Sequence, residues 1–346
     1  NGEPFLNVDS FFDAISDVNE SVRGGYACVG IVNGYGLFAF RDPHGIRPLV
    51  YGKREYDGGT EWVVASESVA ITALGFEIVS DVKPGEAIFI SASGHLFVKQ
   101  CAEPRPFTPC IFEHVYFARP DSNLAGTNVS IARVEMGREL ARRHPVEADL
   151  VIPVPDSGIF AALGFSEELG IPYYPAFVRN HYIGRTFIQP TQMIRDFNVR
   201  VKLNLIRSAV EGKRVVVVDD SIVRGTTARS RVVNLRENGA KEVHMRISCP
   251  PHKNACYYGI DFPDPQKLLA NQCTAAEICK YLGADSIGYL SAEGMVRATG
   301  RPQNEFCLAC FNGDYPVPYD DKFDKLIMEQ RQGKARLLEE PTNRLF

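Results

Sequence analysis

The hydrophobic positions of this chain follow two different patterns, one on each side of a proline-rich stretch at residues 101–109. On the N-terminal side, apolar residues at helical spacing over 11–22 precede short strand-like runs, which turn signals such as Asn33-Gly34 and Ser93-Gly94 separate. This part predicts one helix and an antiparallel sheet, with too little helix to complete an α+β layer. We expect its strands at 26–32, 36–41, 49–51, 62–66, 87–91 and 95–99.

After the proline-rich stretch, strand-like and helix-like segments alternate, which is typical of a doubly wound parallel sheet with crossover helices. Such sheets bind ligands at the carboxyl ends of their strands. The pattern divides the 346 residues into domains at 1–105 and 106–316 and a charged tail at 317–346. In the second domain we expect strands at 148–154, 173–178, 215–220, 241–248 and 286–290, and helices at 130–144, 158–169, 228–238, 275–282 and 292–299.

Composition narrows the class of protein without indicating its function. A hydrophobic content of 45% and a charged content of 23% are typical of a soluble globular protein. The net charge of −4 argues against a nucleic-acid partner. No apolar run approaches the roughly 18 residues that a membrane span needs, so we expect no membrane partner. Nine cysteines, an odd number without a secretory signal, predict reduced thiols and a cytoplasmic location.

The most informative segment runs from Val215 to Thr227. Its four consecutive valines predict a strand that is buried on both faces, and the strand ends in Asp219 and Asp220. A turn of small and hydroxylated residues then opens a helix, whose free N–H groups suit an anion. Because paired carboxylates suit sugar hydroxyls or a metal ion, the segment predicts a sugar phosphate site. The alternative is an acidic strand end followed by a helix that Thr226 or Thr227 caps.

Two further polar segments follow predicted strands. Pro155-Asp156-Ser157-Gly158 is a second strand-to-helix turn, for which an ordinary N-cap is the alternative. Residues 179–190 form a polar, glycine-containing segment with two arginines and a tyrosine, for which a solvated loop is the alternative. Both segments belong to the edge of the sheet where the predicted sugar phosphate site lies.

The segment from Val215 to Thr227 resembles the phosphoribosyl-pyrophosphate (PRPP) loop of the type I phosphoribosyltransferases. Its Asp-Asp-Ser-Ile-Val-Arg-Gly-Thr-Thr part is similar to that of the glutamine PRPP amidotransferases. Residues 113–122 resemble this family's domain junction, and 41–49 and 65–68 resemble parts of its glutaminase domain. The resemblance implies an α/β fold: a type I phosphoribosyltransferase sheet preceded by a partial α+β Ntn-hydrolase-like (class II glutaminase) domain.

The implied activity is that of an amidophosphoribosyltransferase, a pentosyltransferase of purine biosynthesis. Such an enzyme forms 5-phosphoribosylamine from PRPP and ammonia, releases pyrophosphate and so begins de novo purine nucleotide synthesis. The ammonia comes from glutamine in the family, and we expect a homo-oligomer. The alternatives are a base-salvage phosphoribosyltransferase and a non-catalytic PRPP-sensing regulator.

The resemblance also implies a role for each polar segment. The acidic pair holds the ribose hydroxyls, directly or through Mg²⁺, and the turn at 155–158 holds pyrophosphate. The residues implied for PRPP are Asp156, Ser157, Asp219, Asp220, Ser221, Arg224, Gly225, Thr226 and Thr227. Those implied for Mg²⁺ are Ser157, Asp219 and Asp220. A flexible loop that closes over PRPP supplies the implied catalytic set of Arg179, Tyr182 and Arg185.

The flexible loop departs from the family at two positions. Arg179 stands where the family usually has Lys, and His181 stands where it has Arg. The first change keeps the positive charge, whereas the second loses it near neutral pH. We therefore expect loop closure, or charge stabilisation by the loop, to differ from the family's.

Four cysteines form the second candidate site. Cys307 and Cys310 are a C-x-x-C pair, which alone indicates zinc, redox chemistry or coincidence. Cys110 and Cys256 lie in segments that resemble cluster-ligand sites of the family's iron–sulfur branch, and this resemblance implies a [4Fe–4S] cluster on the four thiolates. Cys249 is an alternative to Cys256, and unpaired core cysteines are the alternative to a cluster. Cys28 is expected to be a core residue.

The front of the family's glutaminase domain has no counterpart in this sequence. The family's nucleophile is an N-terminal cysteine that uses its own α-amino group as the base, whereas this sequence starts with Asn1. We expect the sequence to be a fragment or a truncated form that does not hydrolyse glutamine. Phosphoribosylamine formation would then depend on free ammonia.

Overall fold

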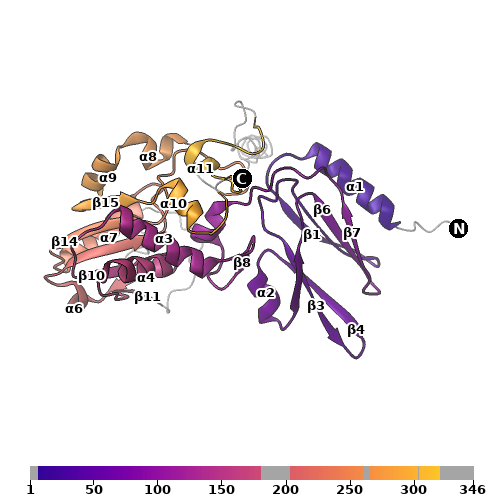
Figure 1. The fold of residues 1–346 in the computed structure, drawn as a ribbon, viewed down its shortest axis with the longest axis horizontal. Coiled ribbons are helices and arrows are strands. Elements are labelled where there is room, and N and C mark those ends of the chain that lie inside the picture. The colour runs from indigo at the N-terminus through magenta and orange to yellow at the C-terminus, as the bar shows by residue number, and fades with distance from the viewer. Residues whose placement is uncertain (1–6, 181–202, 261–264, 303, 320–346) are drawn as a thin grey trace, which may run out of the picture.

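The computed structural model describes residues 7–180, 203–260, 265–302 and 304–319, in which the chain forms two lobes. Antiparallel sheets form one lobe and a parallel sheet the other, and the short helix α11 (Ala309–Asn312) lies where they meet (Figure 1). His181, Tyr182, Arg185 and most of the tail lie outside the described residues. No helix within the described ranges combines the length and the apolar character needed to cross a bilayer.

In the described residues, the N-terminal lobe contains two helices and seven strands, and the strands form two antiparallel sheets. The strands are β1 (Ala27–Val32), β2 (Gly36–Arg41), β3 (Val50–Tyr56), β4 (Gly59–Ala65), β5 (Glu77–Asp81), β6 (Glu86–Ser91) and β7 (Leu96–Gln100). They are ordered β1-β2-β6-β7 and β4-β3-β5. The predicted helix forms as α1 (Val8–Ser21), and its Phe11, Phe12 and Ile15 pack in one core with Phe40 and Phe89 of the first sheet.

The sequence pattern did not predict two elements of this lobe. Helix α2 (Ser68–Ala73) has six residues, too few to show a helical period. Strand β5 pairs only with β3 at one edge of its sheet, and most of its side chains are exposed. An edge strand with so little burial shows no alternation of apolar and polar residues.

The second lobe is built on a parallel sheet, as predicted, and the sheet contains four of the five expected strands. In spatial order they are β10 (Leu150–Pro153), β13 (Arg214–Asp219), β14 (Glu242–Ile247) and β15 (Ser286–Tyr289). The valines at 215–218 are fully buried in β13, in agreement with the prediction. The principal helices are α3 (Val129–Arg143), α4 (Gly158–Leu169), α7 (Thr226–Glu237), α9 (Ala275–Leu282) and α10 (Ala292–Arg297).

Short elements connect these strands and helices. They are the π-helix η1 (Glu113–Phe117), strands β8 (Asn123–Leu124), β9 (Thr127–Asn128), β11 (Phe177–Arg179) and β12 (Leu203–Leu205), helices α6 (Arg207–Val210) and α8 (Leu269–Gln272), and the 3-10 helix η2 (Pro265–Lys267). Helix α4 packs on β10 and β13, with α3 against it, whereas α7 packs on β14 and against α9. A Cβ on Gly137 of α3 would lie 1.9 Å from the Ala161 carbonyl oxygen, so this glycine lets α3 and α4 pack closely.

The strand predicted at 173–178 is wrong as a member of the parallel sheet. Tyr173 makes a single parallel bridge to Val151, and β11 pairs instead with β12 as an antiparallel two-stranded ribbon. Pro172 and Pro175 explain the difference, because neither residue has an N–H to donate to a strand ladder. The domain boundaries at 105/106 and 316/317 stay predictions.

Candidate functional site

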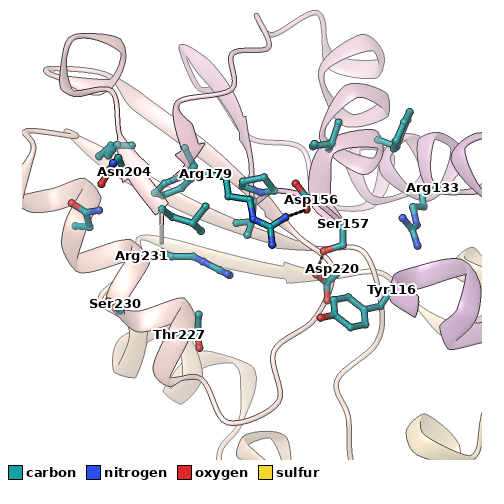
Figure 2. A pocket seen from close by; sticks show the side chains of 18 of the residues that line it. Tyr116, Arg133, Asp156, Ser157, Arg179, Asn204, Asp220, Thr227, Ser230 and Arg231 are labelled. Carbon is teal, nitrogen blue, oxygen red and sulfur yellow. Dashed lines mark hydrogen bonds and ion pairs between the residues drawn. The ribbon is translucent and has the colours of Figure 1, made fainter. Parts of the chain in front are cut away.

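A cavity of about 1310 Å³ opens at the carboxyl ends of β10 and β13 (Figure 2). Its walls include the turn after β10, Asp220 after β13, one face of α7, and residues 116–120 at the end of the π-helix and just after it. This is the edge of a parallel sheet where ligands are expected. Three segments that are distant in sequence therefore converge on one space.

The acidic pair ends β13 at the edge of this cavity. Asp219 is 3% exposed and Asp220 is 7% exposed. Asp220 lines the cavity and accepts hydrogen bonds from the hydroxyls of Ser157, in the turn after β10, and of Ser221. Asp219 points instead to the Arg231 guanidinium on α7, with which it forms an ion pair. Ser157 and the acidic pair, predicted to share a Mg²⁺ ion, thus lie within one hydrogen-bonded group.

The environment of Asp219 disfavours the negative charge of its carboxylate. Burial raises the pKa of Asp219 and the charge of Asp220 adds to this, while the Arg231 guanidinium opposes both effects. A cationic ligand beside the pair would lower the free energy of the ionised carboxylates. Oxygen ligands of this kind are those that Mg²⁺ prefers in proteins.

The loop between β13 and α7 is shaped by Gly225. This residue has φ +77° and serves as the N-cap of α7, and a Cβ there would lie 2.5 Å from Leu269 Cδ2. Helix α7 begins at Thr226, two residues before the predicted start at Ala228, and no side chain caps its first turn. The alternative in which Thr226 or Thr227 caps the helix is therefore wrong. The N–H groups of this first turn suit an anion.

Ser157 is likewise no ordinary cap. It precedes α4 as the N-cap residue, but its side chain makes no capping bond to that helix and donates to Asp220 instead. Its neighbour Asp156 follows a cis peptide bond and accepts a 2.6 Å hydrogen bond from Arg179 Nη1 at the end of β11. Both side chains of this second pair are exposed at the cavity.

The predicted residues fall into three groups around the cavity. Asp156, Ser157, Arg179, Asp220 and Thr227 line it. Asp219, Ser221, Arg224, Gly225 and Thr226 belong to the adjoining end of β13 and the loop, without being part of the lining. Tyr182 and Arg185 lie outside the described residues.

Sequence reasoning missed two arginines that line the cavity. Arg231 lies four residues after Thr227 on α7, so the i, i+4 spacing places both on one face of that helix and was a usable signal. Arg133 of α3 is 3% exposed and donates from Nε to the His114 carbonyl at 2.7 Å and from Nη2 to the Ala118 carbonyl at 2.8 Å. No pattern around Arg133 indicates these contacts, because the carbonyls belong to an irregular segment.

Comparison with known proteins shows the family to which this chain belongs. No family model matches the chain. The amidophosphoribosyltransferase of Archaeoglobus fulgidus is 48% identical over 314 residues, which cover 90% of this chain and 67% of that protein. The chain belongs to the amidophosphoribosyltransferase family. The chain is also 47% identical over 329 residues to the enzyme of Mycobacterium tuberculosis (strain ATCC 25618 / H37Rv). This match covers 93% of this chain and 61% of that protein.

Solved structures of the amidophosphoribosyltransferase family confirm the fold class. The glutamine PRPP amidotransferase from B. subtilis complexed with ADP and GMP has a TM-score of 0.81 and 42% identity, over 92% of this chain and 69% of that one. A structure described as the allosteric regulatory enzyme of purine biosynthesis has a TM-score of 0.82 at 41% identity. The predicted phosphoribosyltransferase sheet and Ntn-hydrolase-like fold are confirmed. The chain spans about 61% of the first curated family members it matches.

The four cysteines expected to hold an iron–sulfur cluster come from three segments that lie side by side in the fold. Cys110 and Cys307 pair in a parallel bridge, and the Cys310 carbonyl accepts hydrogen bonds from the N–H groups of Lys253 and Asn254, each at 3.1 Å. Cys256 Sγ accepts a bond from the Tyr258 N–H at 3.4 Å. All four are 7–8% exposed.

Burial and neighbouring thiols disfavour the ionisation of Cys110, Cys307 and Cys310. Burial raises the pKa of Cys110 and of Cys310 well above its usual value and that of Cys307 to about 12. The pKa of Cys310 is raised further by the charges of Cys110, Cys307 and Cys256, so the four lie within electrostatic reach of one another. In residues 7–180, 203–260, 265–302 and 304–319, no three Cys, His, Asp or Glu side chains converge closely enough to hold a metal ion. The donor type suits a thiolate-bound group, but the four sulfur atoms are not gathered into one ligand shell in the described residues.

Proposed function

We propose that the chain is an amidophosphoribosyltransferase, which displaces pyrophosphate from C1 of PRPP with ammonia and forms 5-phosphoribosylamine. The observation that carries the proposal is the hydrogen bond from Ser157 to Asp220, which joins the turn after β10 to the acidic end of β13 at the cavity. Family membership supports the same reading. It disfavours base salvage and a non-catalytic regulator, because the curated relatives share the name amidophosphoribosyltransferase.

The parts of the cavity suit the parts of PRPP. Asp219 and Asp220 would accept hydrogen bonds from the ribose hydroxyls, and the loop from Arg224 to Thr227 would bind the 5-phosphate through its N–H groups. Asp156 and Ser157 would hold the pyrophosphate end. Ser221 orients Asp220 through its hydroxyl. This arrangement positions the reactants and needs no covalent intermediate.

Mg²⁺ fits the same place. Ser157, Asp219 and Asp220 offer oxygen donors, and both carboxylates are buried at the edge of the cavity. When bound, the ion would neutralise charge on the departing pyrophosphate. Arg179 would lie at the pyrophosphate side, because it bonds to Asp156, whereas Tyr182 and Arg185, expected to act with it, lie outside the described residues.

An assay with free ammonia tests the proposal without requiring glutamine hydrolysis. The purified chain, given PRPP, Mg²⁺ and ammonia, is expected to release pyrophosphate and form phosphoribosylamine. Pyrophosphate release with nucleobases in place of ammonia would support base salvage instead. Binding of PRPP with no turnover in either assay would support the regulator.

We also propose that Cys110, Cys256, Cys307 and Cys310 hold a structural [4Fe–4S] cluster. Their burial and their mutual electrostatic effects support a site that needs a cationic core. A cluster would join three segments that are distant in sequence. Pyrophosphate displacement requires no electron transfer, so its expected role is in stability.

Iron content tests the cluster directly. Anaerobically purified protein is expected to be brown and to contain about four iron atoms per chain. Cys256→Ser should prevent cluster assembly, whereas the matched control Cys28→Ser, in β1, should not. Assembly that survives Cys256→Ser but fails in Cys249→Ser would move the fourth ligand to Cys249. Colourless protein with one zinc per chain would contradict the cluster and leave the PRPP site unaffected.

A cytoplasmic location and a homo-oligomeric state complete the proposal. The nine cysteines form no disulfide, which supports a reducing compartment. Light scattering coupled to size exclusion would measure the oligomeric state, and a monomer would contradict it.

A further inference from the structure

One wall of the cavity is held by the other lobe. Residues 116–120 line the cavity, and Tyr116 points toward it from the π-helix (Figure 2). The Glu67 carboxylate of the N-terminal lobe accepts two hydrogen bonds on its Oε2 from this segment. The donors are the Arg119 N–H at 2.8 Å and the Ser122 hydroxyl at 2.7 Å.

Neighbouring contacts extend this attachment. Ser68, the residue after Glu67, accepts a 2.8 Å hydrogen bond on its hydroxyl from the Asn123 N–H. Ser68 is 5% exposed and Ser122 is fully buried, so water has little access to their two hydroxyls, whereas the bond from the Arg119 N–H to Glu67 is exposed. Glu67 is itself outside the cavity lining. The N-terminal lobe therefore accepts three hydrogen bonds from residues 119–123, at and just after the C-terminal end of the wall.

The second lobe holds the part of the same wall that includes Tyr116. Arg133 of α3 donates to the carbonyls of His114 and Ala118, on either side of Tyr116. Burial lowers the pKa of this guanidinium, and the negative charges of Asp220 and Glu67 oppose that shift. Arg133 thus lies within electrostatic reach of both the cavity acid and the carboxylate of the other lobe. π-Helical turns are rare and frequently occur at functional sites.

We propose that Glu67 is a positioning residue for the PRPP reaction: it fixes the wall that carries Tyr116 and Arg119 and so sets the shape of the cavity from the N-terminal lobe. This inference rests on the proposed function and deepens it. Glu67 contacts the wall through backbone and hydroxyl donors, so its effect on PRPP is indirect.

Kinetic constants of three variants test the role. Glu67→Ala is expected to raise the KM for PRPP about ten-fold or more, with kcat changed by less than about three-fold, because the wall loses two bonds to a charged acceptor. Glu67→Gln keeps an oxygen acceptor for both donors and should recover most of the loss. The control is Glu61→Ala, which removes a carboxylate of the same lobe whose partner is Arg54, and it should leave the KM unchanged.

Hydrogen exchange gives a readout that does not depend on turnover. In Glu67→Ala the amides of residues 116–123 should exchange at least about ten-fold faster, and in Glu61→Ala they should not. If the wild-type chain fails to turn over PRPP, the proposed function is wrong, and this exchange still decides the positioning role. Ser122→Ala removes one donor, should show the same changes to a smaller extent, and serves if Glu67→Ala does not fold. A lower melting temperature with unchanged KM and unchanged local exchange would overturn the inference.

Discussion

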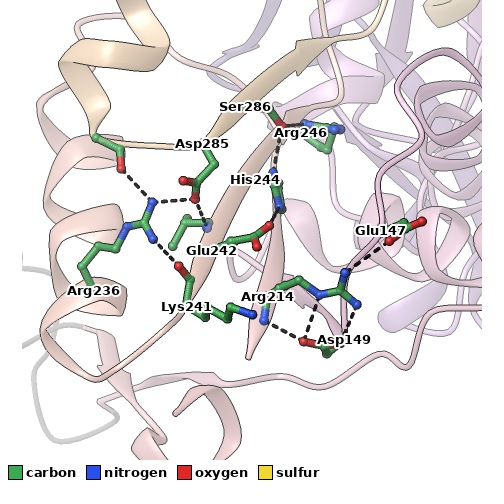
Figure 3. A network of polar contacts seen from close by, with 12 residues as sticks. Glu147, Asp149, Arg214, Arg236, Lys241, Glu242, His244, Arg246, Asp285 and Ser286 are labelled. Carbon is green, nitrogen blue, oxygen red and sulfur yellow. Dashed lines mark hydrogen bonds and ion pairs between the residues drawn. The ribbon is translucent and has the colours of Figure 1, made fainter. Parts of the chain in front are cut away.

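The two ends of the parallel sheet use charge in opposite ways. At the amino ends, charged side chains are paired with one another: Arg214 Nη2 lies 2.9 Å from Asp149 Oδ1, and Arg236 pairs with Asp285 (Figure 3). At the carboxyl ends, Asp219 and Asp220 are adjacent in sequence and buried. Among the described residues, Asp219 forms an ion pair with Arg231, whereas Asp220 forms none.

The carboxyl groups at the two ends respond accordingly. The hydrogen bonds from Arg214 lower the pKa of Asp149 to about 2, whereas burial raises the pKa of Asp219. The charged side chains at the amino ends are already paired and exposed, so a bound ligand would stabilise them little. Crowded, buried acids at the carboxyl ends gain from a cation and from hydroxyl donors, which supports the proposal that the same sheet is structural at one end and binds PRPP at the other.

Removal of either acid at the carboxyl end should have the largest effect. Asp219→Asn or Asp220→Asn removes a charged acceptor for the ribose diol and weakens Mg²⁺ placement. A hydrogen bond to a charged group contributes about 1.5–3 kcal/mol, so ammonia-dependent PRPP turnover should fall roughly ten- to a hundred-fold. Asp149→Asn, at the amino end, should leave turnover unchanged. Equal turnover in all three variants would remove the distinction between the two ends.

Loss of Arg231 should have an intermediate effect that depends on pH. Arg231 holds the pKa of Asp219 down, so Arg231→Gln should let this carboxyl stay protonated up to a higher pH. The acid limb of the kcat/KM profile for PRPP should move to higher pH by about one unit. Arg236→Gln is the matched control, because Arg236 lies on the same helix but pairs with Asp285 at the amino end. A limb that stays in place in Arg231→Gln would mean that Asp219 does not control it.

The smallest effect concerns stability, and its sign differs between the two ends. The pKa of Asp149 is lowered on folding from 3.8, so its contribution is present above about pH 4 and is lost as pH falls toward about 2. The pKa of Asp219 is raised on folding, so its contribution is present below about pH 4 and is lost as pH rises through the folded pKa. Chemical denaturation should therefore give the free energy of unfolding as a function of pH. In Asp149→Asn this free energy should fall less steeply toward acidic pH, and in Asp219→Asn it should fall less steeply as pH rises above about 4. Identical pH profiles for the two variants would contradict this difference.

Local patterns identified much of the second lobe. The four valines before Asp219 require burial on both faces, and β13 is the strand they predict. Helix α9 has its predicted bounds because Thr274 and Glu277 form a capping box and Gly283 ends the helix in a left-handed conformation. Each of these signals acts within a few residues, so the sequence is sufficient to reveal it.

Features that depend on distant segments could not be predicted in this way. The residues around Ser157 left an ordinary helix cap open as the alternative to a ligand site, and its hydroxyl's bond to Asp220 requires β10 and β13 to be neighbours. Arg133 is placed by two carbonyls of a π-helical segment that has no sequence signature. Glu67 contacts a wall more than fifty residues away, across the boundary between the lobes. Tertiary packing decides all three contacts.

Calorimetric titration of PRPP with Mg²⁺ into the wild-type chain, Asp220→Asn and Asp149→Asn tests the central claim most directly. The account predicts that wild type and Asp149→Asn bind PRPP with equal affinity and that Asp220→Asn binds at least about ten-fold more weakly. Omission of Mg²⁺ should weaken wild type and narrow its difference from Asp220→Asn. Equal affinity in Asp220→Asn and wild type, or a loss of affinity in Asp149→Asn, would contradict the placement of PRPP at the carboxyl ends of β10 and β13.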